Sequence, residues 1–147
     1  MEKITIYTDG GARGNPGPAG AGALILNDKG ETLKKASKSL GVQTNNWAEY
    51  EAVVLGLQTL KKLFAKRTKD ISIEVKMDSE LVARQLSGKY QIKEETLFGQ
   101  FIKVHNMQVK DFPDISFTHI PREKNKEADK LANEAMDVIE KLPTLDI

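Results

Sequence analysis

Residues 6–22 read IYTDGGARGNPGPAGAG, an apolar stretch that ends at Asp9 and passes at once into a glycine-rich loop. Glycine reaches backbone conformations that other residues avoid, and it lets a bulky partner come close to the backbone. A carboxylate at the end of a strand beside such a loop is a candidate metal ligand, although an aspartate before a hairpin is the commoner explanation. The segment therefore indicates a functional site only where other carboxylates of the chain converge on Asp9.

The composition is typical of one soluble globular domain. The 147 residues are enough to bury a core, and hydrophobic and charged residues make up 39% and 29% of the chain. An apolar run of about 18 residues, the length that a membrane span needs, is absent. Strand pattern begins by Ile4, which leaves no room for a signal peptide, and cysteine is absent. We therefore expect a cytoplasmic protein without membrane contacts. With a net charge of +1, nucleic-acid binding would have to come from local patches.

Hydrophobic periodicity predicts nine elements in the order β-β-β-α-β-α-α-β-α, hence one α/β domain with a mixed sheet and helices on its faces. The predicted strands cover residues 3–8, 20–27, 31–40, 71–77 and 115–120. The predicted helices cover residues 46–64, 80–86 and 94–110, and a last helix follows Asn125 as its N-cap. Its expected buried stripe is Ala128, Leu131, Ala132, Ala135 and Ile139. The strict alternation ISIEVKM at 71–77 is the clearest strand, and the polar third strand belongs nearer an edge.

Three further acidic residues interrupt the patterns around them. Glu49 lies in the first turn of the predicted long helix, on its apolar face, and Asp78 closes the 71–77 strand at its carboxyl end. Asp129 lies in the first turn of the last helix. Singly, each has a structural explanation, because acids in first turns favour the helix dipole and Asp-Ser is a common cap between a strand and a helix. Together with Asp9, they occupy two strand ends and two helix starts, which can meet at one end of a sheet.

Such a group of carboxylates favours a bound cation. Clustered carboxylates repel one another and shift each other's pKa, and a cation relieves that repulsion. Ligation by oxygen alone suits Mg²⁺ or Mn²⁺, particularly where phosphates of a substrate complete the coordination. The four acids therefore predict a divalent-metal site.

Four motifs of the chain resemble those of type 1 ribonucleases H, and the resemblance extends over nearly the whole sequence. The motifs are YTDGGARGNPGPAGAGALI (7–25), TNNWAEYEAVVLGL (44–57), VKMDSELVARQL (75–86) and HIPREKNKEADKLANEA (119–135). The resemblance implies a ribonuclease H-like fold with a five-stranded mixed sheet in the order 3-2-1-4-5 and helices on both faces. It also implies a single catalytic domain at residues 1–142, followed by a tail at 143–147.

The resemblance implies an enzyme that cleaves the RNA strand of RNA–DNA hybrids and leaves 5′-phosphate and 3′-hydroxyl ends. Its catalytic and metal-binding residues would be Asp9, Glu49, Asp78 and Asp129, holding two Mg²⁺ ions, with Mn²⁺ as a substitute. Asp9 is expected to bridge the two ions. A second role is open to Glu49, a hydrogen bond to the RNA 2′-OH, the group that distinguishes RNA from DNA.

Matched positions in the motifs also imply contacts with the hybrid. Asparagine amides and the hydroxyl of Thr44 would bind sugars and phosphates without reading a base sequence. The expected substrate-binding residues are Gly10, Gly11, Arg13, Asn15, Thr44, Asn45, Asn46, Lys89, Tyr90 and Arg122, with Lys93 beside the loop pair. The two glycines are expected to give the RNA backbone clearance. Helix capping is the alternative for the adjacent asparagines, and a solvated loop is the alternative for the basic-aromatic cluster at 89–93.

Three departures from the family pattern stand out. Residues 87–95 connect two predicted helices where several bacterial members carry a long basic insertion. Because the first strand begins almost at once, we expect no additional hybrid-binding domain before it. The loop PREKN (121–125) carries Arg122 where many members have a histidine, and a guanidinium stabilises phosphate charge but does not shuttle protons at neutral pH. His105 and His119 lie elsewhere and are expected to be structural.

Two other functions remain as alternatives. One is a non-catalytic hybrid-binding module that kept the fold, and the presence of all four acids speaks against it. The other is a different metal-dependent nuclease on the same fold, such as a transposase or a Holliday-junction resolvase, and the segments TNNxAE and DGGxxxNPG point away from it. A protein partner is not implied, and we expect a monomer.

Overall fold

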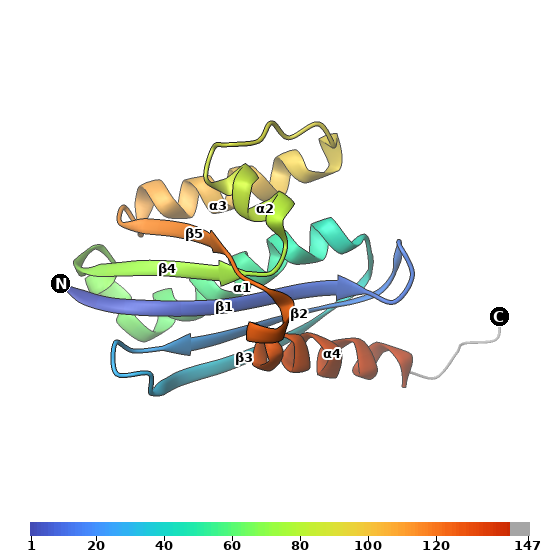
Figure 1. Ribbon diagram of the computed structural model, residues 1–147, viewed down its shortest axis with the longest axis horizontal. Helices are drawn as coiled ribbons and strands as arrows, with labels where there is room; N and C mark the ends of the chain where they lie inside the picture. Colours follow the sequence, from blue (N-terminus) through green and yellow to red (C-terminus); the bar gives the residue numbers. More distant parts are fainter. Residues whose placement is uncertain (142–147) are drawn as a thin grey trace.

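The computed structural model describes residues 1–141, in which a five-stranded sheet in the order β3-β2-β1-β4-β5 carries helices on both faces (Figure 1). The strands are β1 (Glu2–Ala12), β2 (Gly17–Leu26), β3 (Thr32–Gln43), β4 (Ile71–Met77) and β5 (Ile115–His119). The helices are α1 (Asn45–Phe64), α2 (Glu80–Leu86), α3 (Phe98–Lys110) and α4 (Lys126–Glu140). Three short 3₁₀ helices are η1 (Ala65–Asp70), η2 (Glu95–Leu97) and η3 (Arg122–Lys124). The predicted fold and strand order are confirmed; the predicted tail lies outside the described residues.

The centre of the sheet is the parallel pair β1 and β4. Alternate residues of both strands face the core, so that Ile4 pairs with Ile73 and Ile6 with Val75. β2 and β3 continue the sheet antiparallel on one side, and β5 adds a parallel strand on the other. β3 lies at the edge, as its polar sequence predicted. The carboxyl ends of β1, β4 and β5 therefore meet at the same end of the sheet.

Small residues allow two helices to lie directly on opposite faces of the sheet. On one face, Gly56 of α1 packs against Ile6 and Ala23. On the other face, a Cβ atom on Gly22 would lie 2.5 Å from the carbonyl oxygen of Ala128 in α4, and one on Gly20 would lie 2.5 Å from that of Ala132. The two glycines of AGAGALI (19–25) thus bring α4 against the sheet. This contact fixes the end of α4 that carries Asp129.

The boundaries of several elements differ from the predicted ones. β1 continues past residue 8 because Gly10, Gly11 and Ala12 pair with β2, and β2 starts three residues earlier than predicted. The predicted helix 94–110 is divided, since the 3₁₀ turn η2 places Leu97 in the core before α3 begins. Residues 65–70, which lie between the predicted helix at 46–64 and the predicted strand at 71–77, form η1.

The predictions for helix starts and for the last buried stripe were wrong in three details. The cap of α1 is Thr44, whose Oγ1 accepts a hydrogen bond from the amide of Trp47 at 3.3 Å, so the helix begins at Asn45. Asn125 occupies the N-cap position of α4, but its side chain makes no capping bond because it is turned to the backbone of β1. Met136 is buried in α4, whereas Ile139 is only half-buried.

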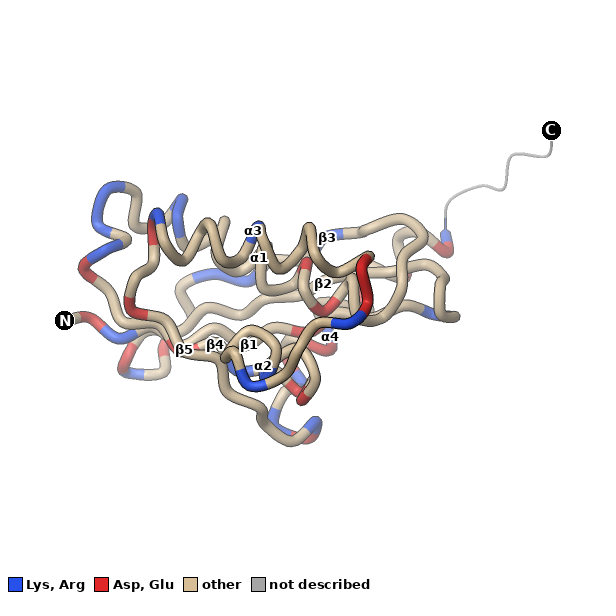
Figure 2. The backbone as a smooth tube through the Cα atoms, turned by 90° about the horizontal axis from the view of Figure 1, so that it is seen from above, with Lys and Arg blue, Asp and Glu red and all other residues tan. Residues whose placement is uncertain are grey.

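Figure 2 shows charged residues of both signs scattered over the backbone, without a basic side and an acidic side. None of the helices in residues 1–141 has the length and apolar character needed to cross a bilayer.

Candidate active site

The neighbouring parallel strands β1 and β4 place two carboxylates, those of Asp9 and Asp78, next to each other. Thr8 of β1 pairs with Met77 of β4 in the parallel register, so the next residues, Asp9 and Asp78, lie side by side at the edge of the pair. β1 continues here along β2, whereas β4 ends and the chain turns into α2. Ser79 caps that helix by accepting a hydrogen bond from the amide of Val82, as the sequence predicted. The turn holds Asp78 beside β1.

The start of α1 brings the third carboxylate. A Cβ atom on Gly10 would lie 2.1 Å from the carbonyl oxygen of Ala48 and 2.6 Å from the amide nitrogen of Glu49. Only a glycine allows α1 to approach β1 this closely. α1 therefore occupies the side of Gly10 on which a Cβ atom would stand, while Gly10 also lines the acidic cavity, and its contact with an RNA backbone stays a prediction. Since α1 begins at Asn45, Glu49 lies just beyond the first turn instead of within it.

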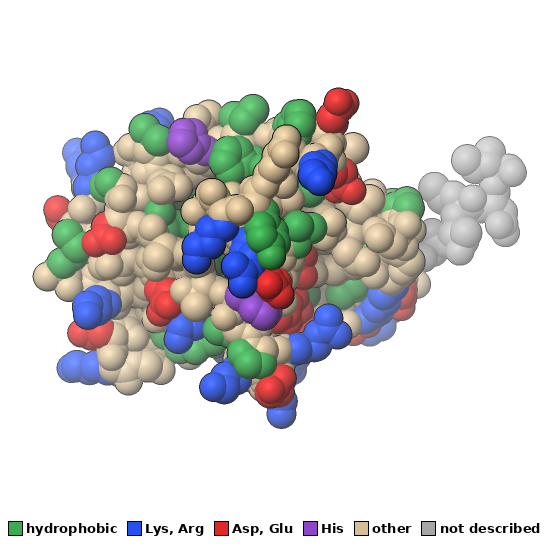
Figure 3. Space-filling model, turned by 45° about the horizontal axis from the view of Figure 1, so that its top comes forward, with side chains coloured by type: hydrophobic (Ala, Val, Ile, Leu, Met, Phe, Trp, Pro, Cys, Tyr) green, Lys and Arg blue, Asp and Glu red, His purple; other side chains and the backbone are tan. Residues whose placement is uncertain are grey.

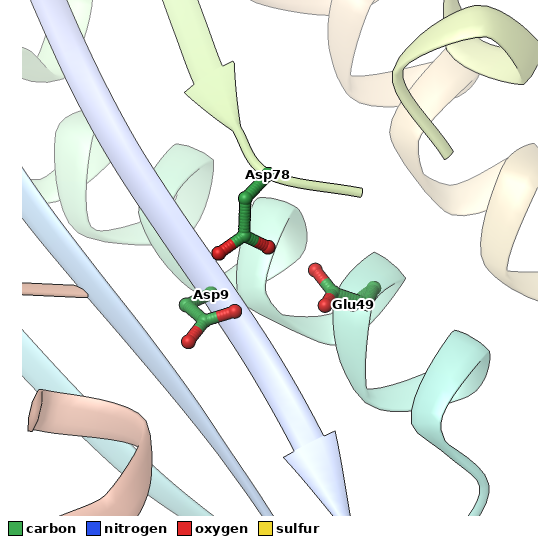
Figure 4. A group of neighbouring side chains, drawn as sticks. All are labelled: Asp9, Glu49 and Asp78. Carbon is green, nitrogen blue, oxygen red and sulfur yellow. The ribbon is translucent and has the colours of Figure 1, made fainter. Parts of the chain in front are cut away.

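Asp9, Glu49 and Asp78 form a compact group of oxygens. One carboxylate oxygen from each lies within 4.8 Å of those of the other two. Figure 4 shows the three side chains pointing toward one another from β1, α1 and the end of β4. Within the described residues, Oε2 of Glu49 is buried and has no hydrogen-bond partner. A cation bound between the three groups would satisfy this oxygen.

Asp129, in the first turn of α4, lies on the other side of Asp9. It is exposed and stands outside the group of three, but its side chain contacts Asp9 closely enough to raise the pKa of that carboxyl group. All four predicted acids line one cavity of about 400 Å³. The structure therefore brings the four acids to one place, with Asp9 between Asp78 and Asp129.

The electrostatics of the cavity disfavour the charged form of two acids. Burial first, and then the charges of Asp78 and Asp129, raise the pKa of Asp9 from 3.8 to about 8. Burial and the charges of Asp9 and Asp78 likewise raise the pKa of Glu49 well above its ordinary value. The amide of Gly10 lowers the pKa of both groups, and Arg122 lowers that of Glu49. Carboxylates held together against their own repulsion fit a divalent cation, which favours their ionised form.

Known proteins similar to this chain share its fold over almost its full length. The family model "Reverse transcriptase-like" matches residues 7–135. The structure of LC11-RNase H1, isolated from compost by a metagenomic approach, has 50% sequence identity and a TM-score of 0.90, over 96% of this chain and 100% of that one. The chain belongs to the type 1 ribonuclease H family.

Other relatives extend this comparison. A second structure shows LC11-RNase H1 in complex with an RNA/DNA hybrid, with 49% identity and a TM-score of 0.90, over 94% of this chain and 99% of that one. Ribonuclease HI of Halobacterium salinarum is 35% identical over 92% of this chain and 65% of its own length. Bifunctional protein Rv2228c of Mycobacterium tuberculosis is 39% identical over 92% of this chain. The chain spans only 36% of that relative's length.

Two of the substrate-binding residues predicted from the ribonuclease H family, Asn15 and Asn45, are connected by hydrogen bonds at the β1–β2 loop. Oδ1 of Asn15 accepts from the amide of Asn45 at 3.0 Å, and Oδ1 of Asn45 accepts from the amide of Ala12 at 2.8 Å. Within residues 1–141, the Nδ2 group of neither side chain donates a hydrogen bond. Asn45 also lines the acidic cavity. The amino group of Asn45 is thus available beside the carboxylates.

Arg13 lines the same cavity, but its guanidinium is bound to α4. Nη1 lies 2.7 Å from Asp137 and 2.8 Å from Glu140, and Nη2 donates to Oδ1 of Asn133 at 3.1 Å. These bonds connect the loop after β1 with the last two turns of α4. They favour a structural role for Arg13 over the predicted substrate contact.

The remaining predicted contacts divide between two hollows. Arg122, in η3, lines the acidic cavity, together with Gly11. A separate hollow of about 610 Å³ lies at α2 and the loop that follows it. It is lined by Asn46, Lys89, Tyr90 and Lys93. There, the guanidinium of Arg84 lies 5.3 Å from the centre of the Tyr90 ring.

The two histidines, which are expected to be structural, both lie at the surface. His105 is exposed on α3, where it stacks on Phe101 at 6.1 Å. His119 is exposed at the carboxyl end of β5. Neither lines the acidic cavity.

Besides Ala12 of β1, the cavity is lined by two residues of α4 that the sequence patterns did not single out, Asn133 and Met136. They follow Asp129 by four and seven positions, so helical spacing alone would have placed them on the same face of α4. The side chain of Asn133 donates to the carbonyl of Asp129 at 2.9 Å and accepts from Arg13.

Proposed function

We propose that this chain is an endoribonuclease that hydrolyses the RNA strand of RNA–DNA hybrids and leaves 5′-phosphate and 3′-hydroxyl ends. The convergence of Asp9, Glu49 and Asp78 within 4.8 Å is the observation that carries the proposal. The hybrid complex of LC11-RNase H1, a relative with 49% identity, supports the choice of substrate.

In this proposal, Asp9, Glu49, Asp78 and Asp129 are the catalytic ligands of two Mg²⁺ ions, with Mn²⁺ as a substitute. Such ions, when bound, activate the attacking water and stabilise the leaving 3′ oxygen. Asp9 suits the position shared by both ions because Asp78 and Asp129 act on it from two sides. Oxygen ligands alone, with a phosphate to complete them, are the set that Mg²⁺ prefers.

The chain's own groups then orient the substrate. Arg122, which acts on Glu49 electrostatically, stabilises negative charge on the scissile phosphate. Glu49 and the free amino groups of Asn15 and Asn45 are placed to bond 2′-hydroxyl and sugar oxygens, contacts that distinguish RNA from DNA. Lys89 and Tyr90 contact the DNA strand from the second hollow.

The proposal includes the organisation of the protein. Residues 1–142 act as one catalytic domain, a monomer in the cytoplasm, without a protein partner. On the face shown in Figure 3, basic and acidic side chains are mixed. This supports binding of a polyanion through local basic patches and not through a uniformly basic surface. Size-exclusion chromatography with light scattering tests the monomer directly.

One experiment tests the function. The protein is incubated with end-labelled RNA–DNA hybrid, double-stranded RNA and double-stranded DNA, each with Mg²⁺ or with EDTA. We expect cleavage of the RNA strand of the hybrid with Mg²⁺ only. Binding of the hybrid without cleavage would favour a non-catalytic module, and cleavage of double-stranded DNA would favour another nuclease of the same fold. Full cleavage in EDTA would exclude the metal-dependent mechanism.

A further inference from the structure

The side chain of Asn125 connects the two ends of the chain beneath the acidic cavity. It is 1% exposed, and its Nδ2 donates a hydrogen bond to the carbonyl oxygen of Thr8 at 2.9 Å, across 117 positions of sequence. Thr8 directly precedes Asp9 on β1. A single buried amide group therefore holds the backbone that carries Asp9.

The backbone of Asn125 is bonded to two other parts of the site. Its carbonyl oxygen accepts from the amide of Asp129 at 3.0 Å, and its own amide donates to the carbonyl of Arg122 at 3.0 Å. One residue thus has hydrogen bonds to the residue before Asp9, to Asp129 and to Arg122. The positions of these three groups depend on each other through Asn125.

The orientation of the side chain favours this link over ordinary capping. An asparagine at an N-cap normally accepts from an amide of the first helical turn, and that bond stabilises the helix. Asn125 makes no such bond, and within the described residues its Oδ1 is buried without a partner. Rotating the amide by half a turn would place Oδ1 against the carbonyl of Thr8 and repel it. The donor therefore faces Thr8 although a buried acceptor is left unsatisfied, which costs stability.

We propose that Asn125 is a positioning residue that sets the separation of Asp9 and Asp129, so that both carboxylates reach the same bound cation. The inference rests on the proposed metal-dependent function of this cavity. Asp129 is the one acid of the four that stands outside the compact group, and it comes from the far end of the chain. Its distance from Asp9 is therefore the part of the site that most needs a fixed connection.

The first test compares wild type with Asn125→Ala by calorimetric titration of the metal-free protein with Mn²⁺. We expect metal affinity to fall about 10- to 100-fold, the usual effect of losing a group that orients metal ligands. In hybrid cleavage, kcat should fall while the KM for the hybrid changes little. Raising the Mg²⁺ concentration should restore part of the lost rate.

Two further variants make the test specific. Asn125→Asp keeps the volume but replaces the donor by an acceptor facing Thr8, so it should lose at least as much metal affinity. Asn27→Ala is the control, because Asn27 also has hydrogen bonds, to Glu31 and Lys29, but in the β2–β3 hairpin. It should keep wild-type Mn²⁺ affinity and Mg²⁺ dependence.

The outcomes separate this inference from the proposed function. If Asn125→Ala or Asn125→Asp melts at a lower temperature but binds Mn²⁺ like wild type, the positioning role is overturned. If wild type cleaves no hybrid, the proposed function fails. The calorimetric comparison of Mn²⁺ affinity would still test whether Asn125 positions the metal ligands. Affinity lost equally in Asn27→Ala would also overturn the inference, because general destabilisation would then explain it.

Discussion

At the residue scale, the acidic cavity disfavours the ionised form of the buried carboxyl groups that line it. Asp9 is the clearest case, with a pKa raised to about 8 by burial and by Asp78 and Asp129. Because the folded-state value exceeds the ordinary 3.8, the folded protein holds a proton that the unfolded chain has released between about pH 4 and pH 8. In the absence of metal, the contribution of Asp9 to stability is therefore most favourable below about pH 4, and it falls as the pH rises from about 4 to about 8.

This linkage predicts how Asp9→Asn changes stability. At pH 8 in EDTA, the variant should be more stable than wild type by about 0.5–2 kcal/mol, the usual gain when a strained functional site is relieved. The advantage should shrink toward pH 4, because the folded wild type then keeps the proton on Asp9 and does not bear a buried charge. Urea unfolding at several pH values measures it. A difference that stays constant from pH 4 to pH 8 would contradict the assigned cause.

Sequence patterns located the acids because each one interrupts an apolar or capping pattern at the end of an element. The same patterns did not reveal the role of Asn125, since its bond to Thr8 depends on how the first strand and the last helix pack together. Arg13 was assigned to substrate for a similar reason. Its partners Asp137 and Glu140 are more than a hundred positions away, and the sequence gives no signal that connects them.

At the scale of elements, the site depends on how closely α1 approaches β1. The sequence predicted both elements and their order, but it did not show that Gly10 serves helix packing, because that contact is visible only in three dimensions. Strand and helix ends were also misplaced where pairing and 3₁₀ turns, instead of local periodicity, decide them. The central strand β4, whose alternation is strict, was predicted with its correct ends.

Gly10→Ala tests this packing, with Gly11→Ala as a neighbouring control. A methyl group on Gly10 collides with the backbone of Ala48, so we expect a loss of about 1–3 kcal/mol in the free energy of unfolding and slower cleavage. A methyl group on Gly11 would be 3.7 Å from Cε of Met136, an ordinary contact, and should change stability little. Thermal and urea unfolding of both variants give the comparison. Equal losses would disprove the close approach of α1 as the reason for glycine.

At the carboxyl end of α1, the reverse substitution, alanine to glycine, is expected to stabilise the protein. Ala65 follows the helix with a φ of 49°, a conformation that favours glycine over residues with a Cβ atom. Ala65→Gly should therefore raise the free energy of unfolding by about 1 kcal/mol. Cleavage should be unaffected, because Ala65 lies at the end of the molecule opposite to the acids. Urea unfolding measures the gain, and a less stable variant would refute the strain at this residue.

At the scale of the whole molecule, the net charge of +1 makes hybrid binding depend on a few cations. The hollow with Lys89 and Lys93 is the nearest basic surface that the fold provides beside α2. Replacing both by alanine should weaken hybrid binding and reduce the slope of log affinity against log salt by about 1 to 2. Binding titrations at several salt concentrations measure both. The control is Lys66→Ala with Lys69→Ala in η1, at the opposite end of β4, which should leave the slope unchanged.

The central claim is that Asp9 within β1 and Asp78 directly after β4 take part in metal-dependent cleavage of the RNA strand. The most direct test compares single-turnover hybrid cleavage by wild type, Asp78→Asn and Asp70→Asn in saturating Mg²⁺. Asp70 and Asp78 directly precede and follow the same strand, β4, so the two variants make the same chemical change at its opposite ends. We predict wild-type rates for Asp70→Asn and a loss of at least about a hundredfold for Asp78→Asn. Cleavage by Asp78→Asn at the wild-type rate would contradict the claim.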